Sequence, residues 1–155
     1  MDFNQILSQY RIVHVNIRGI NSNKRNLEHY LGEHNYPEIV TLNETMLNRN
    51  KGIKIQGYYC AARKEPTGMS GKHGSMILVR ETLQDVVELD FLSTQFQEEV
   101  IGIEIKRNDR RPGLNIVTYY RNLESGICMI TLMVQFSRVT LIASTWHGGQ
   151  APPTP

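Results

Sequence analysis

The segment from Ile12 to Glu44 constrains the fold more than any other part of the chain, because it has the pattern of a strand, a short helix and a second strand. The β-branched run from Ile12 to Asn16 predicts the first strand, and the run from Ile39 to Leu42 predicts the second. Between them, apolar side chains recur at helical spacing until Pro37. Strands joined by so short a helix lie parallel and adjacent with a right-handed crossover, so we expect both carboxyl ends at the same edge of one sheet.

Asn16 and Glu44 stand where these two predicted strands end. Open α/β sheets bind ligands just outside the carboxyl ends of their strands. An amide and a carboxylate at that edge, with nothing apolar to cover them, predict a site for a metal ion or a phosphate. Each residue has a plainer interpretation by itself, Asn16 as the cap of a turn and Glu44 as a solvated loop carboxylate. Their order and their shared edge favour the site.

The same segment resembles the opening of the endonuclease/exonuclease/phosphatase family, whose members are metal-dependent phosphodiesterases. It is most similar to the apurinic-endonuclease-like domain of retrotransposons that lack long terminal repeats (non-LTR retrotransposons). The resemblance is carried by HVNIRGINSNKRNLEHYL and, after a short gap, by YPEIVTLNET. Gly57-Tyr58 with Arg63, and Gly74-Ser75 before an apolar run, match later steps of the family pattern.

This resemblance implies a fold class and a domain boundary. The family fold is a four-layer α/β sandwich with mixed sheets, and we expect its N-terminal part over residues 10–143, with the second half missing. Residues 144–155, which include His147, are low in complexity and are expected to form a disordered tail. A sandwich half without its partner sheet leaves an apolar face uncovered, so we also expect aggregation or association.

The resemblance further implies three catalytic residues and a metal cofactor. Glu44 would hold Mg²⁺, a hard cation that prefers carboxylate ligands and keeps several waters. Asn16 would support the site through hydrogen bonds. Tyr120 ends the strand Val117-Thr118-Tyr119-Tyr120, and in the family the tyrosine at that place points its hydroxyl at the scissile phosphate. A half-buried strand tyrosine with no such role is the alternative.

DNA is the partner that the resemblance implies, and no small-molecule cofactor is expected. The formal net charge of +2 permits a DNA substrate without arguing for one. Basic side chains near the start of the predicted helix are candidates for contacts with flanking phosphates, namely Arg18, Lys24 and Arg25. A basic helix start is also commonly a solvated face. The oligomeric state is open.

The pattern of the later chain predicts three features in order: an antiparallel hairpin of Glu99–Ile105 with Leu114–Tyr120, an apolar run of helical length over Ile127–Phe136, and a short strand over Val139–Ala143. In the family this last strand leads into Gly-Asp-x-Asn, and a later Asp-His pair completes the catalytic centre. Here Ser144-Thr145-Trp146 follows the strand. A hydroxyl cannot replace the negative charge that orients the attacking water.

Two functions of different classes therefore stay open. The first is a metal-dependent endonuclease domain of a retroelement, which hydrolyses DNA phosphodiester bonds; in this chain we expect cleavage to be lost because the Asp-x-Asn and Asp-His motifs are absent. The second is a non-enzymatic, truncated or decayed retroelement fragment. A phosphatase or a lipid phosphodiesterase of the same fold is a further alternative, because fold does not imply function.

Composition bears on the compartment. The chain has 155 residues with 40% apolar content, which suffices for one domain with a buried core. Cys60 and Cys128 are far apart and have no zinc-binding spacing, so both are expected to be reduced thiols of an intracellular protein. No signal peptide is visible, and no apolar run is long enough to cross a bilayer. We expect a nuclear or cytoplasmic protein that is not secreted and does not contact a membrane.

Overall fold

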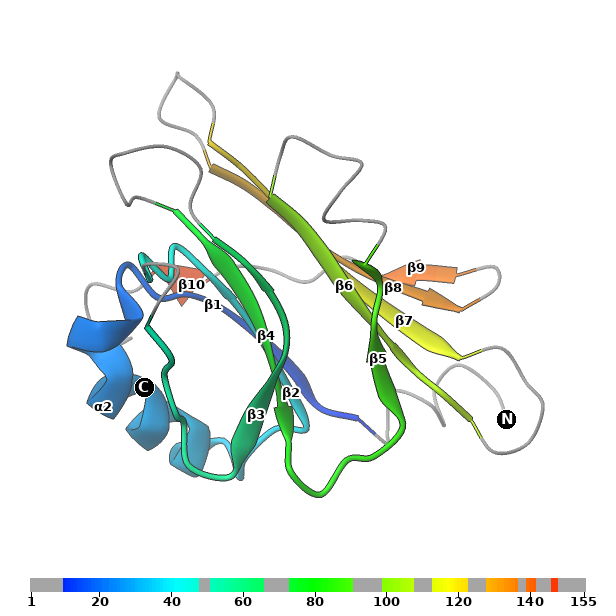
Figure 1. The fold of residues 1–155 in the computed structure, drawn as a ribbon, viewed down its shortest axis with the longest axis horizontal. Helices are drawn as coiled ribbons and strands as arrows, with labels where there is room; N and C mark the ends of the chain where they lie inside the picture. Colours follow the sequence, from blue (N-terminus) through cyan, green and yellow to red (C-terminus); the bar gives the residue numbers. More distant parts are fainter. Residues whose placement is uncertain are drawn as a thin grey trace, which may run out of the picture.

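The computed structural model describes residues 10–47, 51–65, 73–90, 99–107, 113–122, 128–136, 139–141 and 146–147. Over these ranges the chain forms one α-helix and ten β-strands, and the strands make two five-stranded sheets. Figure 1 shows the helix, the first sheet and the second sheet as successive layers. The protein is therefore a mixed α/β structure, as expected.

The first sheet has the strand order β10-β1-β2-β4-β3. This sheet and the helix consist of β1 (Ile12–Asn16), α2 (Ile20–Glu33), β2 (Ile39–Asn43), β3 (Tyr58–Lys64), β4 (Ser75–Arg80) and β10 (Trp146–His147). β1 and β2 are parallel neighbours, with Asn16 opposite Asn43 at their carboxyl ends. This confirms that the two strands end at the same edge, while β4 runs antiparallel beside β2.

Helix α2 covers the outer face of the first sheet (Figure 1). It begins directly after Gly19, whose φ of +96° turns the chain sharply away from β1. The helical side chains that are buried against the sheet follow one face of the helix and are Ile20, Leu27 and Leu31. Their apolar partners on the sheet include Val15 of β1 and Leu42 of β2. This burial fixes the start of α2 beside the carboxyl ends of the two parallel strands.

The second sheet has the strand order β5-β6-β7-β8-β9. Its strands are β5 (Val86–Glu88), β6 (Glu99–Ile105), β7 (Leu114–Asn122), β8 (Cys128–Phe136) and β9 (Val139–Leu141). β6 and β7 pair antiparallel from Glu99 opposite Tyr120 to Ile105 opposite Leu114, which confirms the predicted hairpin. Val86–Glu88 pairs antiparallel with β6 and forms a short strand at the edge of this sheet.

Two expectations for this part of the chain are wrong. The run Ile127–Phe136 was predicted from its length to be helical, but Cys128–Phe136 is strand β8, antiparallel to β7. A run that is apolar at most positions has no period that separates a helix from a strand, and here the edge of β7 decides the outcome. The partner sheet is also not missing, because residues 86–141 contain its five strands.

The strand predicted over Val139–Ala143 is present as β9, but it pairs with β8 in the second sheet. Within the segment 144–155, which we expected to be disordered, Trp146–His147 forms β10 beside β1, so the expectation fails for these two residues. The rest of that segment lies outside the described residues.

The inner faces of the two sheets are apolar at one end and polar at the other. The apolar end is a core of buried side chains from both sheets: Ile39, Ala62, Ile77, Val79, Ile101, Ile103, Ile105, Leu114 and Ile116. Because side chains alternate along a strand, the inward positions that continue these rows carry a second set, which we call the polar end: His14, Asn16, Thr41, Asn43, Ser75, Glu99, Thr118 and Tyr120. All eight are buried, and the candidate site lies among them.

Candidate metal and phosphate site

The three residues that the sequence pointed to come together at the polar end. Asn16 Nδ2 donates a hydrogen bond to Glu44 Oε1 over 3.0 Å. The hydroxyl of Tyr120, from the second sheet, donates to the same oxygen over 2.9 Å. Asn16 and Tyr120 are 1% and 3% exposed, so a carboxylate from the loop after β2 is held between an amide of the first sheet and a phenol of the second.

The loop that carries Glu44 is tied down on both sides. Glu44 has a φ of +54° and Met46 a φ of +52°. These values lie in the left-handed region, which residues other than glycine adopt at a cost of about 1 kcal/mol or more. The carbonyl of Glu44 accepts the amide proton of Gly19 over 2.7 Å. On the other side, Met46 N–H donates to the carbonyl of His73 over 2.8 Å. These backbone bonds keep the carboxylate at the edge where β1 and β2 end.

The amide of Asn16 is oriented by the carboxylate. Since Glu44 Oε1 can only accept, the nitrogen of the amide must face it, and the oxygen must face away. In the described part of the chain, Asn16 Oδ1 is buried and has no hydrogen-bond partner. A buried carbonyl oxygen without a partner costs about 1–3 kcal/mol. A cation or a hydrogen-bond donor of a ligand that reaches this side of the amide would satisfy it.

His73 also belongs to the candidate site, although no sequence pattern pointed to it. Tyr120 uses its single proton toward Glu44, so its oxygen accepts from His73 Nδ1, which lies 3.3 Å away. His73 has a φ of +82° and is followed by Gly74 with a φ of +94°. The sequence has no pair of histidines at the i, i+4 spacing that would mark a metal site on a helix. A contact between two sheets leaves no such periodic signal.

The donor set fits Mg²⁺ with the protein supplying few ligands. Among the described residues, no three His, Cys, Asp or Glu side chains gather in a way that could hold a metal ion by themselves. Mg²⁺ commonly binds proteins through one or two carboxylates and completes its shell with waters and substrate phosphates. Glu44, with the unpartnered Asn16 Oδ1 beside it, matches that pattern.

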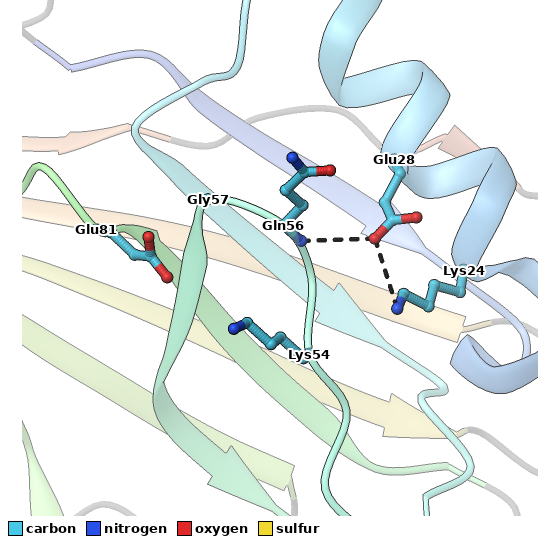
Figure 2. Close-up of a pocket in the computed structure, with 6 residues that line it drawn as sticks. All are labelled: Lys24, Glu28, Lys54, Gln56, Gly57 and Glu81. Carbon is cyan, nitrogen blue, oxygen red and sulfur yellow. Dashed lines mark hydrogen bonds and ion pairs between the residues drawn. The ribbon is translucent and has the colours of Figure 1, made fainter.

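The three basic candidates lie at different places along the junction of β1 and α2 and on the helix itself. Lys24 makes an ion pair with Glu28 over 3.7 Å, and both line a polar groove on the side of α2 (Figure 2). The other residues that line this groove are Lys54, Gln56, Gly57 and Glu81. Arg18 is exposed in the turn between β1 and α2, which places it near the carboxyl end of β1, and Arg25 is exposed on the helix.

A further row of buried polar groups runs behind the site. His14 Nδ1 lies 2.6 Å from Thr41 Oγ1, and His14 Nε2 lies 3.5 Å from Asn43 Nδ2. Burial lowers the pKa of His14 from 6.5 to about 4. The ring is therefore neutral at neutral pH and fills a hydrogen-bonding place between the sheets. Its two contacts, both to strand β2, come from its inward position on β1, which the period of two would have indicated.

The strand β10 lies beside β1 at the same edge. Its register places His147 opposite Asn16 in a parallel pair. The chain therefore returns to the edge of the first sheet where β1 ends. The neighbouring Ser144-Thr145, which stand in place of the family's Asp-x-Asn motif, lie outside the described residues.

No protein-family model matches this chain, and no curated protein sequence matches it. In the part of the chain that the structure describes, no helix has both the length and the apolar character needed to cross a membrane.

Proposed function

We propose that this chain is an endonuclease-type domain of the endonuclease/exonuclease/phosphatase fold, derived from a retroelement, which binds Mg²⁺ and a DNA phosphodiester at the polar end. The observation that carries the proposal is the meeting of Asn16, Glu44 and Tyr120 around one carboxylate oxygen. The three residues also lie at the edge of the first sheet where the parallel strands β1 and β2 end, and open α/β sheets bind ligands at the carboxyl ends of parallel strands.

Each residue has a distinct part in this proposal. Glu44 supplies the charge that attracts the cation, and Asn16 orients Glu44 and offers its buried amide oxygen. Tyr120 holds Glu44 in place and can turn its hydroxyl to a phosphate oxygen once the carboxylate is occupied by the cation. When bound, Mg²⁺ would polarise the phosphoryl oxygen and stabilise the leaving oxyanion.

Binding without efficient cleavage is the outcome that the residues support. Hydrolysis needs a group that orients and deprotonates the attacking water, and removing one member of a catalytic set costs orders of magnitude in rate. In the family an Asp-x-Asn motif supplies such a group directly after the strand that corresponds to Val139–Ala143, and here Ser144-Thr145-Trp146 stands in its place. We therefore propose a cation-dependent DNA-binding domain whose nicking of plasmid does not exceed that of a Glu44→Ala variant.

The test is calorimetric titration with Mg²⁺ and Mn²⁺, combined with fluorescence anisotropy on a labelled DNA duplex. Glu44→Gln keeps the shape of the side chain and removes its charge, so cation affinity should fall roughly tenfold or more. Glu33→Gln is the matched control, because Glu33 is an exposed carboxylate at the end of α2 that is farther from the site, and it should bind like the wild type. Mg²⁺ should strengthen DNA binding by the wild type and by Glu33→Gln, and it should not do so for Glu44→Gln.

Three results would overturn the proposal in different ways. Equal cation affinity in the wild type and Glu44→Gln would remove the metal site. Absence of any cation-dependent DNA binding would favour the non-enzymatic fragment. Plasmid nicking that Glu44→Ala abolishes would show a working nuclease centre and refute the loss of cleavage.

A further inference from the structure

Glu99 is a buried carboxyl group that joins the two sheets directly behind the candidate site. It lies at the start of β6, is 5% exposed, and stands opposite Tyr120 in the hairpin. Its Oε1 accepts the amide proton of Gly74 over 2.8 Å, and its Oε2 lies 2.8 Å from Ser75 Oγ. A side chain of the second sheet thus holds the start of β4 in the first sheet.

The turn that Glu99 holds is the one that positions the site. The carbonyl of Gly74 accepts the amide proton of Thr45 over 3.0 Å, next to Glu44 in the chain. His73, in the same turn, reaches Tyr120, which donates to Glu44. Glu99 is therefore connected to Glu44 by two routes, one through the backbone and one through side chains.

The hydrogen bonds indicate which groups carry protons. Asn43 Nδ2 faces His14 Nε2, so Asn43 Oδ1 is the atom that meets Ser75 Oγ, at 3.0 Å. Ser75 has one proton to give. If it donates to Asn43, the contact with Glu99 Oε2 is a hydrogen bond only when the carboxyl group itself is the donor. Every member of the row is then satisfied, with His14 Nδ1–H donating to Thr41.

We propose that Glu99 keeps its proton in the assembled site and acts as a positioning residue, which locks the His73–Gly74 turn against the loop that carries Glu44. The part that concerns Glu44 rests on the proposed function. In the alternative arrangement the Asn43 amide is flipped by 180°, Ser75 donates its proton to Glu99, and Glu99 is ionised. The experiment below distinguishes this arrangement from the protonated one.

The charge environment agrees with a retained proton. Burial is the largest effect on Glu99 and raises the pKa of its carboxyl group above the usual 4.5. The hydrogen bond from Gly74, the contact with Ser75 and the charges of His73 and Lys64 lower the pKa of Glu99 but do not cancel the effect of burial. Of the other titratable groups that face this region, Tyr120 engages Glu44, and His14 is neutral above a pKa of about 4.

Glu99→Gln is the informative variant, because an amide can donate to Ser75 and accept from Gly74 as a protonated carboxyl group does. A carboxyl group with a raised folded-state pKa stabilises the fold at low pH, and this contribution is lost as pH rises through that pKa. Chemical unfolding of full-length wild type and Glu99→Gln across a pH series should therefore show equal stability near pH 4.5 and an advantage for Glu99→Gln at higher pH. The acid-side loss from His14 occurs in both proteins and cancels in the difference.

The positioning role of Glu99 needs a second measurement that does not change merely because the fold becomes more or less stable. With ring-labelled tyrosine, the Tyr120 resonance, assigned through Tyr120→Phe, should stay in place in Glu99→Gln and shift in Glu99→Ala. Mn²⁺ affinity, measured where each protein is fully folded, should be unchanged in Glu99→Gln and weakened roughly tenfold in Glu99→Ala. The resonance does not need a cation, so it tests Glu99 even if the wild type binds no Mn²⁺ and the proposed function fails.

The outcomes divide cleanly. A wild type that is more stable than Glu99→Gln at neutral pH, and loses this advantage as pH falls, would show an ionised Glu99 and refute the retained proton. An unshifted Tyr120 resonance in folded Glu99→Ala would reduce Glu99 to a structural residue. If Glu99→Ala does not fold, Ser75→Ala, which removes one of the two contacts of Glu99, takes its place and should shift the same resonance.

Discussion

Strained backbone and buried polar side chains occur together around Glu44. Glu44, Met46 and His73 all have positive φ values, although none is a glycine. Such conformations persist only where surrounding contacts over-determine them, and they cluster at functional sites. Here the contacts are backbone hydrogen bonds: Gly19 donates to the carbonyl of Glu44, and the loop donates from Thr45 and Met46 to the carbonyls of the His73–Gly74 turn. The strain therefore serves to present one carboxylate at a defined place.

Tyr120→Phe tests whether the phenol holds that carboxylate. The substitution removes the donor to Glu44 Oε1 and the acceptor of His73 Nδ1, so we expect a loss of about 1 kcal/mol in the free energy of unfolding. Tyr119→Phe is the control, since it lies on the opposite face of β7 and should cost less. Urea unfolding of both variants measures the difference. Equal losses would mean that the Tyr120 hydroxyl contributes nothing specific.

Asn16 and Glu44 could be placed from the sequence because Asn16 ends β1 and Glu44 directly follows β2, and strand ends can be predicted from local patterns. Tyr120 lies two residues before the end of β7, and it was placed only by the family resemblance. Glu99 and His73 could not. Glu99 has no motif around it, and its role comes from contacts with residues 24 and 25 positions earlier in the chain, on the other sheet. Such contacts depend on how the sheets face one another, which no local pattern fixes.

At the level of elements, the junction between β1 and α2 connects the helix to the site. Gly19 ends the turn after β1, and its amide proton goes to the carbonyl of Glu44 over 2.7 Å. Ile20, the first residue of α2, donates to Thr45 in the same loop over 3.0 Å. Helix, strand and loop are therefore fixed to one another by these two consecutive backbone bonds beside the site.

Gly19→Ala should disturb this junction. At a φ of +96° a Cβ is strained, and we expect a loss of about 1–2 kcal/mol with weaker cation binding. Gly52→Ala provides the control, because its added Cβ meets nothing within 4 Å, and its effect should stay within about 0.5 kcal/mol. Thermal melts and Mn²⁺ titrations of the two variants make the comparison. A Gly19→Ala protein that behaves like Gly52→Ala would show that the junction tolerates a side chain.

The secondary-structure elements also show where sequence patterns predict the structure and where they do not. β1, α2, β2, β6 and β7 have clear periods or β-branched runs, and all were predicted close to their observed bounds. The run Ile127–Phe136, which contains β8, was expected to be helical from its length, and it has no period that separates a helix from a strand. The nine residues of β8 can form either element, and pairing with β7 along the register Asn115 to Asn122 selects the strand.

On the scale of the whole molecule, the second sheet changes what the protein buries. With it in place, the inner face of the first sheet is covered, and the apolar core between the sheets draws on β6 and β7 as well as on β2 and β4. The expected aggregation through an uncovered inner face loses its basis. In the described part of the chain, no helix covers the outer face of the second sheet, because the one described helix packs against the first sheet. Val87, in the second sheet, is 41% exposed.

This arrangement predicts opposite responses at two adjacent positions of β7. Ile116 points into the core between the sheets and is fully buried, so Ile116→Ala should lower the free energy of unfolding by about 2–5 kcal/mol. Val117 lies on the outer face and is half-buried, so Val117→Ala should cost about 1 kcal/mol or less. Because the core is shared, circular dichroism and tyrosine fluorescence should report one coincident transition in each variant. Two separate transitions, or a larger loss at Val117, would mean that the sheets do not fold as one packed unit, and the site that spans them would lose its support.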